Sequence, residues 1–308
     1  PTRRSSDLVA GVKCDLCPRK CLVDRKKGEK GICGQTENLK VARAALHFWE
    51  EPCISGDAGS GAVFFSGCPL HCVFCQNENI ANGTVGKEIS LERLVDIFLE
   101  LQEKRANNIN LVTPGHFVPQ IVKALDQARK EGLTLPVVYN TSSYETVDTI
   151  KMLEGYVDIY LPDFKYMSPV LSKKYSHAPD YAEVAKAAIA EMVRQTGKAV
   201  FVNGDEDNLI LSGTIVRHLT LPGCMADSMQ ILKYLHDTYG DMIYISIMNQ
   251  FTPLSNLEKY PELNRRITDE EYETLVDYAI EIGIENGFIQ EGNTAEESFI
   301  PAFDCEGV

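Results

Sequence analysis

Gly67-Cys-Pro-Leu-His-Cys-Val-Phe-Cys75-Gln-Asn77 follows the apolar run Ala62-Val-Phe-Phe65 and determines how the rest of the chain is interpreted. Its three cysteines, Cys68, Cys72 and Cys75, are separated by three and then two residues. One loop with this spacing can ligate a 4Fe-4S cluster, whereas full protein ligation of such a cluster takes four cysteines. The sequence therefore predicts a cluster with one open iron, which can bind a small molecule.

Zinc and buried free thiols are the alternatives for this loop. Zinc favours paired Cys-x2-4-Cys hooks with a matching second pair, and no second hook follows within reach. An open iron suits S-adenosylmethionine (SAM), whose amino and carboxylate groups can chelate the metal. The cofactors would then supply radical chemistry, and the protein would supply position and electrostatics.

Four further cysteines lie close together near the N-terminus: Cys14, Cys17, Cys21 and Cys33. Four thiols can close a tetrahedral zinc site, which stabilises small loop-rich modules. They can equally hold a second iron–sulfur cluster that passes electrons or binds substrate. We expect a second metal here, and the spacing does not decide which.

Composition favours one large intracellular domain with an appendage. The chain has 308 residues, of which 44% are hydrophobic, and the longest apolar runs are too short to cross a bilayer. Open clusters need reduced thiols, which indicates the cytoplasm. The net charge of −14, concentrated after Arg266, disfavours nucleic-acid binding. We expect residues 1–8, which resemble a translated sequencing adapter, to be an artefactual tail, with a Cys-rich extension at 9–58 and the core at 59–308.

Short β-rich runs alternate with amphipathic helical stretches from residue 62 onward, which is typical of βα units with a parallel sheet. The expected strands are 62–66, 109–113, 136–141, 157–161, 214–221 and 242–248. The expected helices are 90–105, 119–131, 144–153, 181–195 and 228–239. Thr268 and Glu271 form a capping-box pattern that starts a last helix. Six such units predict an incomplete α/β barrel.

The chain resembles the radical-SAM superfamily and, within it, the PflX-like iron–sulfur proteins related to pyruvate formate-lyase activating enzymes. The matching stretches include the cysteine loop with Phe74 before its last cysteine. The others are Cys14-Asp-Leu-Cys-Pro-Arg-Lys-Cys21, Glu50-Glu-Pro-Cys-Ile-Ser-Gly56, Asn108-Ile-Asn-Leu-Val-Thr-Pro114, Val157-Asp-Ile-Tyr-Leu-Pro-Asp-Phe-Lys-Tyr166 and Val216-Arg-His-Leu219. The resemblance implies a partial (β/α)6 radical-SAM barrel with a Cys-rich N-terminal extension.

Reactive groups in parallel barrels collect at the carboxyl ends of the strands. There, Asp163 and Lys165 resemble the Leu-Asp-x-Lys of activating enzymes, which contacts the methionine part of SAM. The alternative for this pair is a surface salt bridge. The resemblance also places Phe74 beside the cofactors.

Four more residues are candidates for cofactor binding. Many relatives carry Gly-Gly-Glu after the second strand to hold the SAM amino group; this chain lacks it, and Thr113 could donate a hydrogen bond there. Asn140 could bind ribose hydroxyls or form a plain helix-start turn. Arg217 and His218 alternate faces, and we expect Arg217 to point inward. Gln250 could replace the His that activating enzymes carry near the sixth strand end, or only bond within the core.

The resemblance implies reductive cleavage of SAM to methionine and a 5′-deoxyadenosyl radical. The substrate could be a glycyl-radical protein, and the electron donor a flavodoxin or ferredoxin. A non-catalytic iron–sulfur redox sensor or electron carrier is the alternative. A zinc-dependent protein-binding module is a third possibility, and it predicts no iron on purification.

Overall fold

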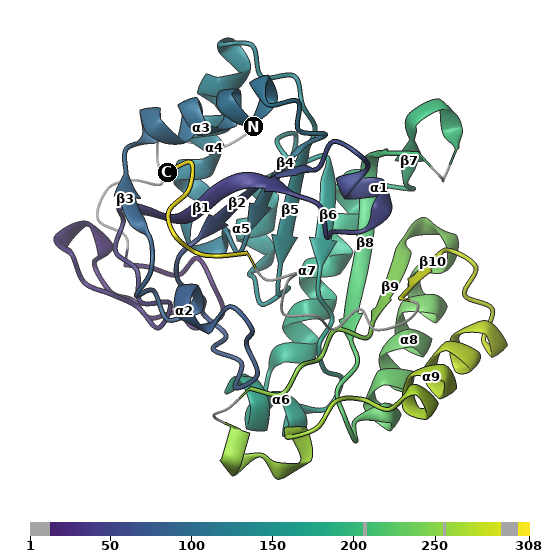
Figure 1. The fold of residues 1–308 in the computed structure, drawn as a ribbon. Helices are drawn as coiled ribbons and strands as arrows, with labels where there is room; N and C mark the ends of the chain where they lie inside the picture. The colour runs from purple at the N-terminus through teal and green to yellow at the C-terminus, as the bar shows by residue number, and fades with distance from the viewer. Residues whose placement is uncertain (1–12, 206–207, 255–256, 291–300) are drawn as a thin grey trace.

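The computed structural model describes residues 13–205, 208–254, 257–290 and 301–308, so residues 1–8 lie outside the described part. A ten-stranded sheet forms its centre in the order β10-β9-β8-β6-β5-β4-β2-β1-β3, and β7 pairs with β8 off this path (Figure 1). The strands are β1 (Leu39–His47), β2 (Ser60–Phe65), β3 (Lys87–Ile89), β4 (Ile109–Val112), β5 (Val137–Thr141), β6 (Ile159–Pro162), β7 (Val200–Phe201), β8 (Ile210–Leu219), β9 (Tyr244–Met248) and β10 (Gly287–Ile289).

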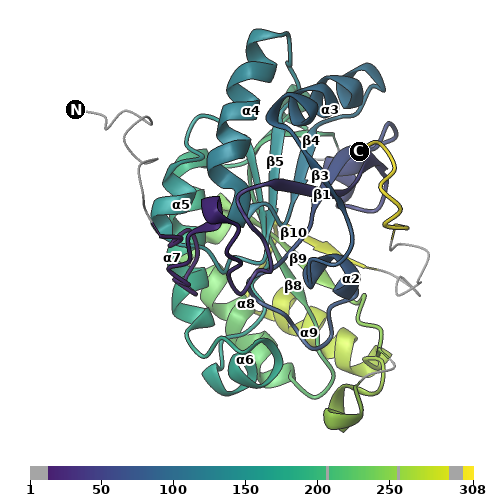
Figure 2. The ribbon, with the colours of Figure 1, turned by 90° about the vertical axis from the view of Figure 1, so that its left-hand side faces the viewer.

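Helices cover one face of this sheet, as Figure 2 shows from the side. Helix α3 packs against α4, α5 against α7, and α8 against α9. The helices are α1 (Pro52–Ser55), α2 (Glu78–Ala81), α3 (Leu91–Glu103), α4 (Val118–Lys130), α5 (Val147–Lys151), α6 (Pro169–Ser176), α7 (Tyr181–Thr196), α8 (Met225–Tyr239) and α9 (Asp269–Glu281).

Most neighbouring strands run parallel, and the sheet is open. The pairs from β2 through β4, β5, β6, β8 and β9 to β10 are all parallel. Strand β1 is antiparallel to both β2 and β3. Within the described residues β3 and β10 end the sheet without pairing to each other. This confirms the predicted partial barrel, with its parallel strands linked by helical crossovers.

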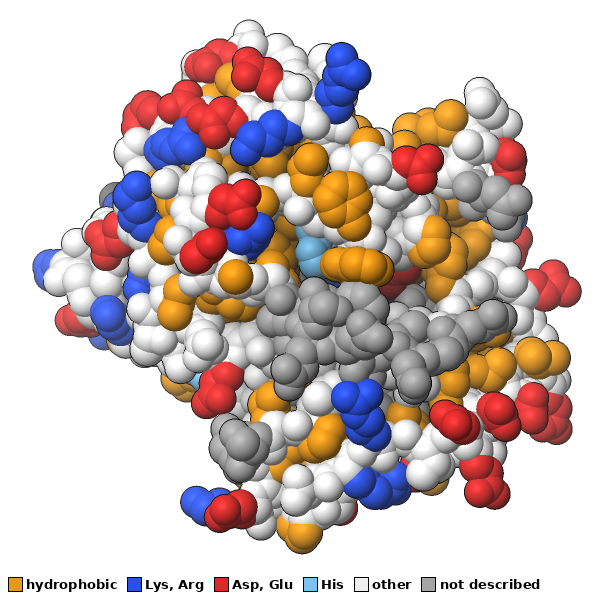
Figure 3. Space-filling view, in the orientation of Figure 1, with side chains coloured by type: hydrophobic (Ala, Val, Ile, Leu, Met, Phe, Trp, Pro, Cys, Tyr) orange, Lys and Arg blue, Asp and Glu red, His pale blue; other side chains and the backbone are white. Residues whose placement is uncertain are grey.

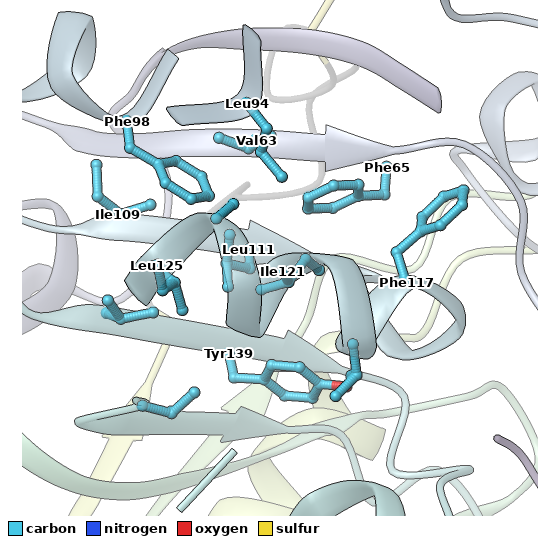
Figure 4. Close-up of a cluster of buried hydrophobic side chains, with 14 of the residues drawn as sticks. Val63, Phe65, Leu94, Phe98, Ile109, Leu111, Phe117, Ile121, Leu125 and Tyr139 are labelled. Carbon is cyan, nitrogen blue, oxygen red and sulfur yellow. The ribbon is translucent and has the colours of Figure 1, made fainter. Parts of the chain in front are cut away.

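Strand side chains alternate between the two faces of the sheet. Those that face the helices form the larger hydrophobic core. Val63 and Phe65 of β2 and Tyr139 of β5 pack with Phe98 of α3 and Ile121 of α4 (Figure 4). The opposite face of the same strands carries a different set, including Phe64. Asn140, next to Tyr139, therefore points away from the helices and toward the open side.

The predicted elements match the structure closely, with β2, β4, β5, β6, β8 and β9 near their expected bounds. Helix α9 begins after Thr268, and the Thr268–Glu271 capping box forms as expected. Seven of the described strands and α-helices were not predicted: β1, β3, β7, β10, α1, α2 and α6. Strands β3 and β10 have three residues each, too short for a period-2 pattern to stand out.

The C-terminal segment lies along β1 and also contacts α3, whose Arg93 donates to the Gly307 carbonyl over 3.0 Å. Ala44 of β1 donates its backbone N–H to Glu306, and Cys305 donates its own to Ala42. Acidic side chains gather over α9 (Figure 3), as the charge distribution predicted. Among the described helices, none has the length and apolarity that crossing a membrane would require.

Candidate active site

A cavity of about 740 Å³ opens at the carboxyl ends of the parallel strands. Its wall includes the cysteine loop after β2 and residues that follow or end β4, β5, β6 and β9. Among the predicted site residues, it is lined by Cys68, Cys72, Cys75, Thr113, Asn140, Asp163, Lys165, Arg217 and Gln250. Strand-end side chains meet here because parallel strands end at the same edge of the sheet.

The cysteine loop runs from the end of β2 to α2, and its sulfur atoms receive hydrogen bonds. Ser176 of α6 donates its hydroxyl to the Cys72 sulfur over 3.0 Å. The backbone N–H of Leu70 lies 3.5 Å from the Cys68 sulfur. Such donors favour thiolates over thiols, and thiolates are the form that binds metal. All ten cysteines of the chain are described, and all are free.

Burial raises the pKa of each thiol in this loop, to about 11 for Cys68 and about 12 for Cys75. For Cys72 burial also raises the pKa, while Lys165 and the Ser176 hydroxyl oppose that shift. The positive charge of Lys165 lowers the pKa of all three. Iron must therefore displace three protons on binding, and the cationic lysine favours that exchange. The donor chemistry fits a cluster held by three cysteines.

One row of side chains crosses the inner face of the sheet beside this loop. Asp163 pairs with Arg217 in register, Arg217 with Ser246, and Ser246 with Phe288. The neighbours of Arg217 along β8 face the helices instead, because the strand alternates. His218 bonds the Ser228 hydroxyl of α8 over 2.9 Å. Arg217 therefore points inward, as expected.

Arg217 is the centre of a buried network of five polar side chains, its own included. Its guanidinium donates to Asp163 over 3.1 Å, to Glu50 over 2.9 Å and to Asn140 over 2.6 Å. Glu50 also accepts from Asn140 over 3.2 Å. Lys165 donates to the other Asp163 oxygen over 2.7 Å. The planar guanidinium fixes the relative positions of groups from β5, β6, β8 and the segment before α1.

The network keeps its charges despite burial. Burial alone would raise the pKa of Asp163, but Lys165 and Arg217 outweigh it and hold that pKa below its usual value. Burial would lower the pKa of Lys165, and Asp163 reverses that shift. Lys165 and Asp163 have only 15% of their side-chain surface exposed. The Asp163–Lys165 pair is thus not a surface salt bridge but a charged pair facing the cavity.

Tyr181 of α7 holds the backbone of this pair from behind. Its hydroxyl accepts the Lys165 N–H over 3.0 Å and lies 2.9 Å from the Ser142 carbonyl and 3.0 Å from the Asp163 carbonyl. The tyrosine is fully buried. It thereby ties the ends of β5 and β6 to the helical layer.

Tyr181→Phe should lower the free energy of unfolding by about 1–3 kcal/mol, because the buried Lys165 N–H loses its partner. Urea denaturation measures the change. Tyr278→Phe removes a hydroxyl from a half-buried position on α9 and should change the value by less than about 0.5 kcal/mol. Equal losses in the two variants would contradict the role given to Tyr181.

The N-terminal cysteine segment packs directly on the cysteine loop of the barrel. Arg19 donates to the carbonyls of Pro69, Ser176 and His177 over 2.6–3.1 Å. The His71 ring bonds the Ile32 carbonyl over 2.7 Å. A side chain at Gly67 would lie 2.5 Å from the Cys33 carbonyl, so only glycine fits at this contact. The segment therefore braces the loop on its outer side.

Arg19→Ala should loosen this brace, since it removes three charge-assisted hydrogen bonds. We expect cleavage of residues 13–34 by a protease to become severalfold faster. Lys30→Ala removes the same charge from an exposed position of the segment and is the control. Mass spectrometry of timed digests gives the rates, and identical rates for both variants would refute the brace.

The four N-terminal cysteines lie within electrostatic reach of one another. Burial raises the pKa of Cys17 to about 12, and Cys33 and Cys21 add to that shift. Burial also raises the pKa of Cys33, with Cys14 and Cys21 contributing. Across the described ranges, no three His, Cys, Asp or Glu side chains gather as one metal ion would require. A metal at these cysteines stays a prediction.

Glu145, beyond the end of β5, is a fully buried carboxyl near the cysteine segment. It accepts from Thr141 over 2.7 Å and from Tyr139 over 3.1 Å. Burial outweighs these hydrogen bonds and raises its pKa from 4.5 to about 7. The folded protein therefore binds a proton here that the unfolded chain releases above about pH 4.5.

The contribution of Glu145 to stability should fall as pH rises from about 4.5 to 7, where this carboxyl holds a proton in the folded state but not in the unfolded state. The shift of Glu145 corresponds to roughly 3 kcal/mol. Glu145→Gln should remove this dependence. The free energy of unfolding of the variant should therefore increase relative to that of wild type as pH rises, and the difference should stop increasing above about pH 7. Urea denaturation at pH 5 and pH 8 measures it; a difference independent of pH would contradict the assignment.

The structure places four of the residues predicted to bind the cofactors in different surroundings: Phe74, Thr113, Asn140 and Gln250. Phe74 packs against Tyr166 and Phe251 behind the loop and does not line the cavity. Thr113 lines it with a positive φ of 55°, and Gln250 lines it and accepts from Gln76 over 2.9 Å through its backbone carbonyl. Asn140 is bound within the network. The role of the Gln250 side chain stays a prediction.

Three residues of the site were not predicted: Glu50, Asn110 and Tyr181. Asn110 donates to Glu50 over 2.9 Å and completes the acceptor set of that carboxylate. Glu50 and Arg217 are 167 positions apart, so no local spacing could connect them. The motif Glu50-Glu-Pro-Cys-Ile-Ser-Gly56 was the only signal in the sequence that could have singled out Glu50.

Thiols on one loop and a buried ionic network meet at the strand ends of an open parallel sheet. These features define the class of partial α/β barrels that hold a reactive cofactor at this edge. Residues 62–208 match the family model described as the Radical SAM superfamily. This part of the chain is a radical SAM domain, and the superfamily implies an enzyme with a 4Fe-4S cluster and SAM.

One curated protein resembles the chain in sequence, and solved structures share its fold at low identity. An uncharacterized protein of Methanocaldococcus jannaschii is 27% identical over 275 residues, 86% of this chain and 74% of the relative. HydG, a maturase of the FeFe-hydrogenase, is 15% identical with a TM-score of 0.50, covering 75% of this chain and 52% of HydG. Methylornithine synthase (PylB) is 15% identical, also at 0.50, covering 72% and 60%. The chain thus spans little more than half of these two solved structures.

Proposed function

We propose that this protein cleaves SAM reductively at a 4Fe-4S cluster held by Cys68, Cys72 and Cys75. The observation that carries the proposal is the shared cavity, because the three thiols and the Asp163–Lys165 pair line the same cavity. When bound, the reduced cluster supplies the electron that yields methionine and a 5′-deoxyadenosyl radical, which abstracts hydrogen from substrate.

The chain's own residues position SAM. Lys165 and Asp163 offer one charge of each sign to a zwitterionic amino acid, and Arg217 keeps both in place. Asn140 and Thr113 line the same cavity and suit ribose hydroxyls and the amino group. Gln250 contributes a further polar wall, and Phe74 supports the loop from the core. Enclosing these groups keeps water from the radical.

Substrate, electron donor and second metal follow from the resemblance and the cysteine pattern. We infer a glycyl-radical protein as substrate, as for pyruvate formate-lyase activating enzymes, and a flavodoxin or ferredoxin as donor. Cys14, Cys17, Cys21 and Cys33 would hold zinc or a second iron–sulfur cluster. Free thiols throughout the chain support the cytoplasm as its compartment.

Anaerobic reconstitution followed by dithionite and SAM tests the function. Wild type should form 5′-deoxyadenosine and methionine in equal amounts, and Cys68→Ala should form neither. An intact cluster that yields no 5′-deoxyadenosine would favour the redox sensor or electron carrier instead. Protein without iron would favour the zinc module.

A further inference from the structure

Glu51 is a buried carboxyl of the cavity wall that the network does not use. It precedes α1, and its backbone carbonyl accepts from Ile54 and Ser55, but its side chain makes no capping hydrogen bond. Only 8% of the residue is exposed. Ser246 is a side-chain hydrogen-bond partner of the carboxyl, whereas Oε2 meets no partner among the described residues.

Among the described residues, the cavity lining carries one carboxyl more than it has cations. Its lining contains the carboxyls of Glu50, Glu51 and Asp163 against the cations of Lys165 and Arg217. Glu50 and Asp163 are the two that pair with Arg217. His47 also lines the cavity, but burial lowers its pKa, with Arg43 and Arg217 adding to the shift and Glu50 opposing it, so it adds no charge at neutral pH.

Glu51 belongs to the part of the wall that adjoins a second hollow. Trp49, Glu50 and Pro52 line both this hollow and the main cavity. Glu51 itself lines only the main cavity, as the cysteines of the loop do. The segment that carries Glu51 therefore borders both spaces, and its carboxyl lies in the wall of the one that the cysteines line.

We propose that Glu51 is a specificity-determining residue that binds an alkylammonium or alkylguanidinium group of the substrate. An N–H-bearing cation would supply both the missing hydrogen bond to Oε2 and the missing positive charge. This rests on the proposed function and names the chemistry of its substrate. A lysine-like or arginine-like side chain of a protein substrate carries such a group.

Protonation of Glu51 gives an independent signature of this contact. Burial raises its pKa and Glu50 adds to the shift, while Arg217 and the Ser246 hydroxyl oppose it. Cys53 of α1 is a further titratable group that interacts with Glu51. A bound cation favours the carboxylate, so binding should release protons, and affinity should rise with pH.

The test uses n-butylguanidine and n-butylamine as probes, with n-butanol as the neutral control, on reconstituted wild-type protein. Isothermal titration calorimetry in two buffers of different ionisation enthalpy measures affinity and proton release. Fluorescence of Trp49, the only tryptophan, reports the same event from the cavity wall. At least one cation should bind with proton release, and n-butanol should bind more weakly by tenfold or more.

Variants locate the contact. Glu51→Gln should weaken cation binding at least tenfold and more than it weakens SAM binding, whereas Glu51→Asp should retain part of the affinity. Glu285→Gln removes the same charge from an exposed site and should change neither the affinity for the cation nor the affinity for SAM. No cation binding by wild type, equal binding by Glu51→Gln, or a larger loss of SAM than of cation affinity would overturn the inference. Cation binding without SAM cleavage would support the subsite and refute the proposed function.

Discussion

Cys72→Ala should lose about four irons and four sulfides per chain after anaerobic reconstitution, because two thiols cannot retain a cluster that three hold in one loop. Formation of 5′-deoxyadenosine should fall to background. Ser176 donates to the Cys72 sulfur, so this thiol is the one whose environment α6 sets. Iron and sulfide analysis with product chromatography measures both effects.

Cys224→Ala is the matched control, since Cys224 is also a half-buried thiol and lies at the start of α8, outside the loop. It should retain its iron and its activity. Metal that remains in both proteins belongs to a second site and should disappear with Cys17→Ala. Unchanged iron and sulfide in Cys72→Ala would refute the assignment of the loop.

Arg217→Met should lower the free energy of unfolding by about 3–5 kcal/mol, the loss expected when one partner of a buried ion pair is removed. Glu50 and Asp163 would both lose the cation between them. The loss should shrink as pH falls, because protonation neutralises the carboxylates that are left. Urea denaturation at pH 5 and pH 8 measures it.

Arg217→Lys keeps the charge but not the planar fork, and we expect an intermediate loss. Lys233→Met is the control on the surface, where ion pairs contribute about 0–1 kcal/mol. A loss below about 1 kcal/mol for Arg217→Met would show that the network does not hold the strand ends together.

The parallel core could be predicted because its signals are local. Strands β4, β5 and β6 are apolar runs bounded by turns, and each of the intervening helices has an apolar face. Strand β1 escaped prediction because its residues, including Lys40, Arg43 and three alanines, are poor strand formers. Its conformation depends on pairing with β2, which is a tertiary effect.

The residues of the site can also be separated into those with a local signal in the sequence and those that only the folded structure brings together. Cys68, Cys72 and Cys75 share one loop, and their spacing singled them out. Asp163 and Lys165 share one strand end, and that position together with the resemblance to activating enzymes singled them out. Glu50 and Tyr181 reach the site from a segment before α1 and from α7, and their roles depend on the folded backbone. Long-range contacts of this kind leave no periodic pattern in the chain.

The electron paramagnetic resonance spectrum of the dithionite-reduced protein, recorded with and without SAM, tests the shared cavity most directly. A cluster whose open iron faces Asp163, Lys165 and Arg217 should change its g-values when SAM is added, and Lys165→Ala should require higher SAM concentrations for the same change. A reduced cluster whose spectrum is identical with and without saturating SAM would contradict the assignment of this cavity.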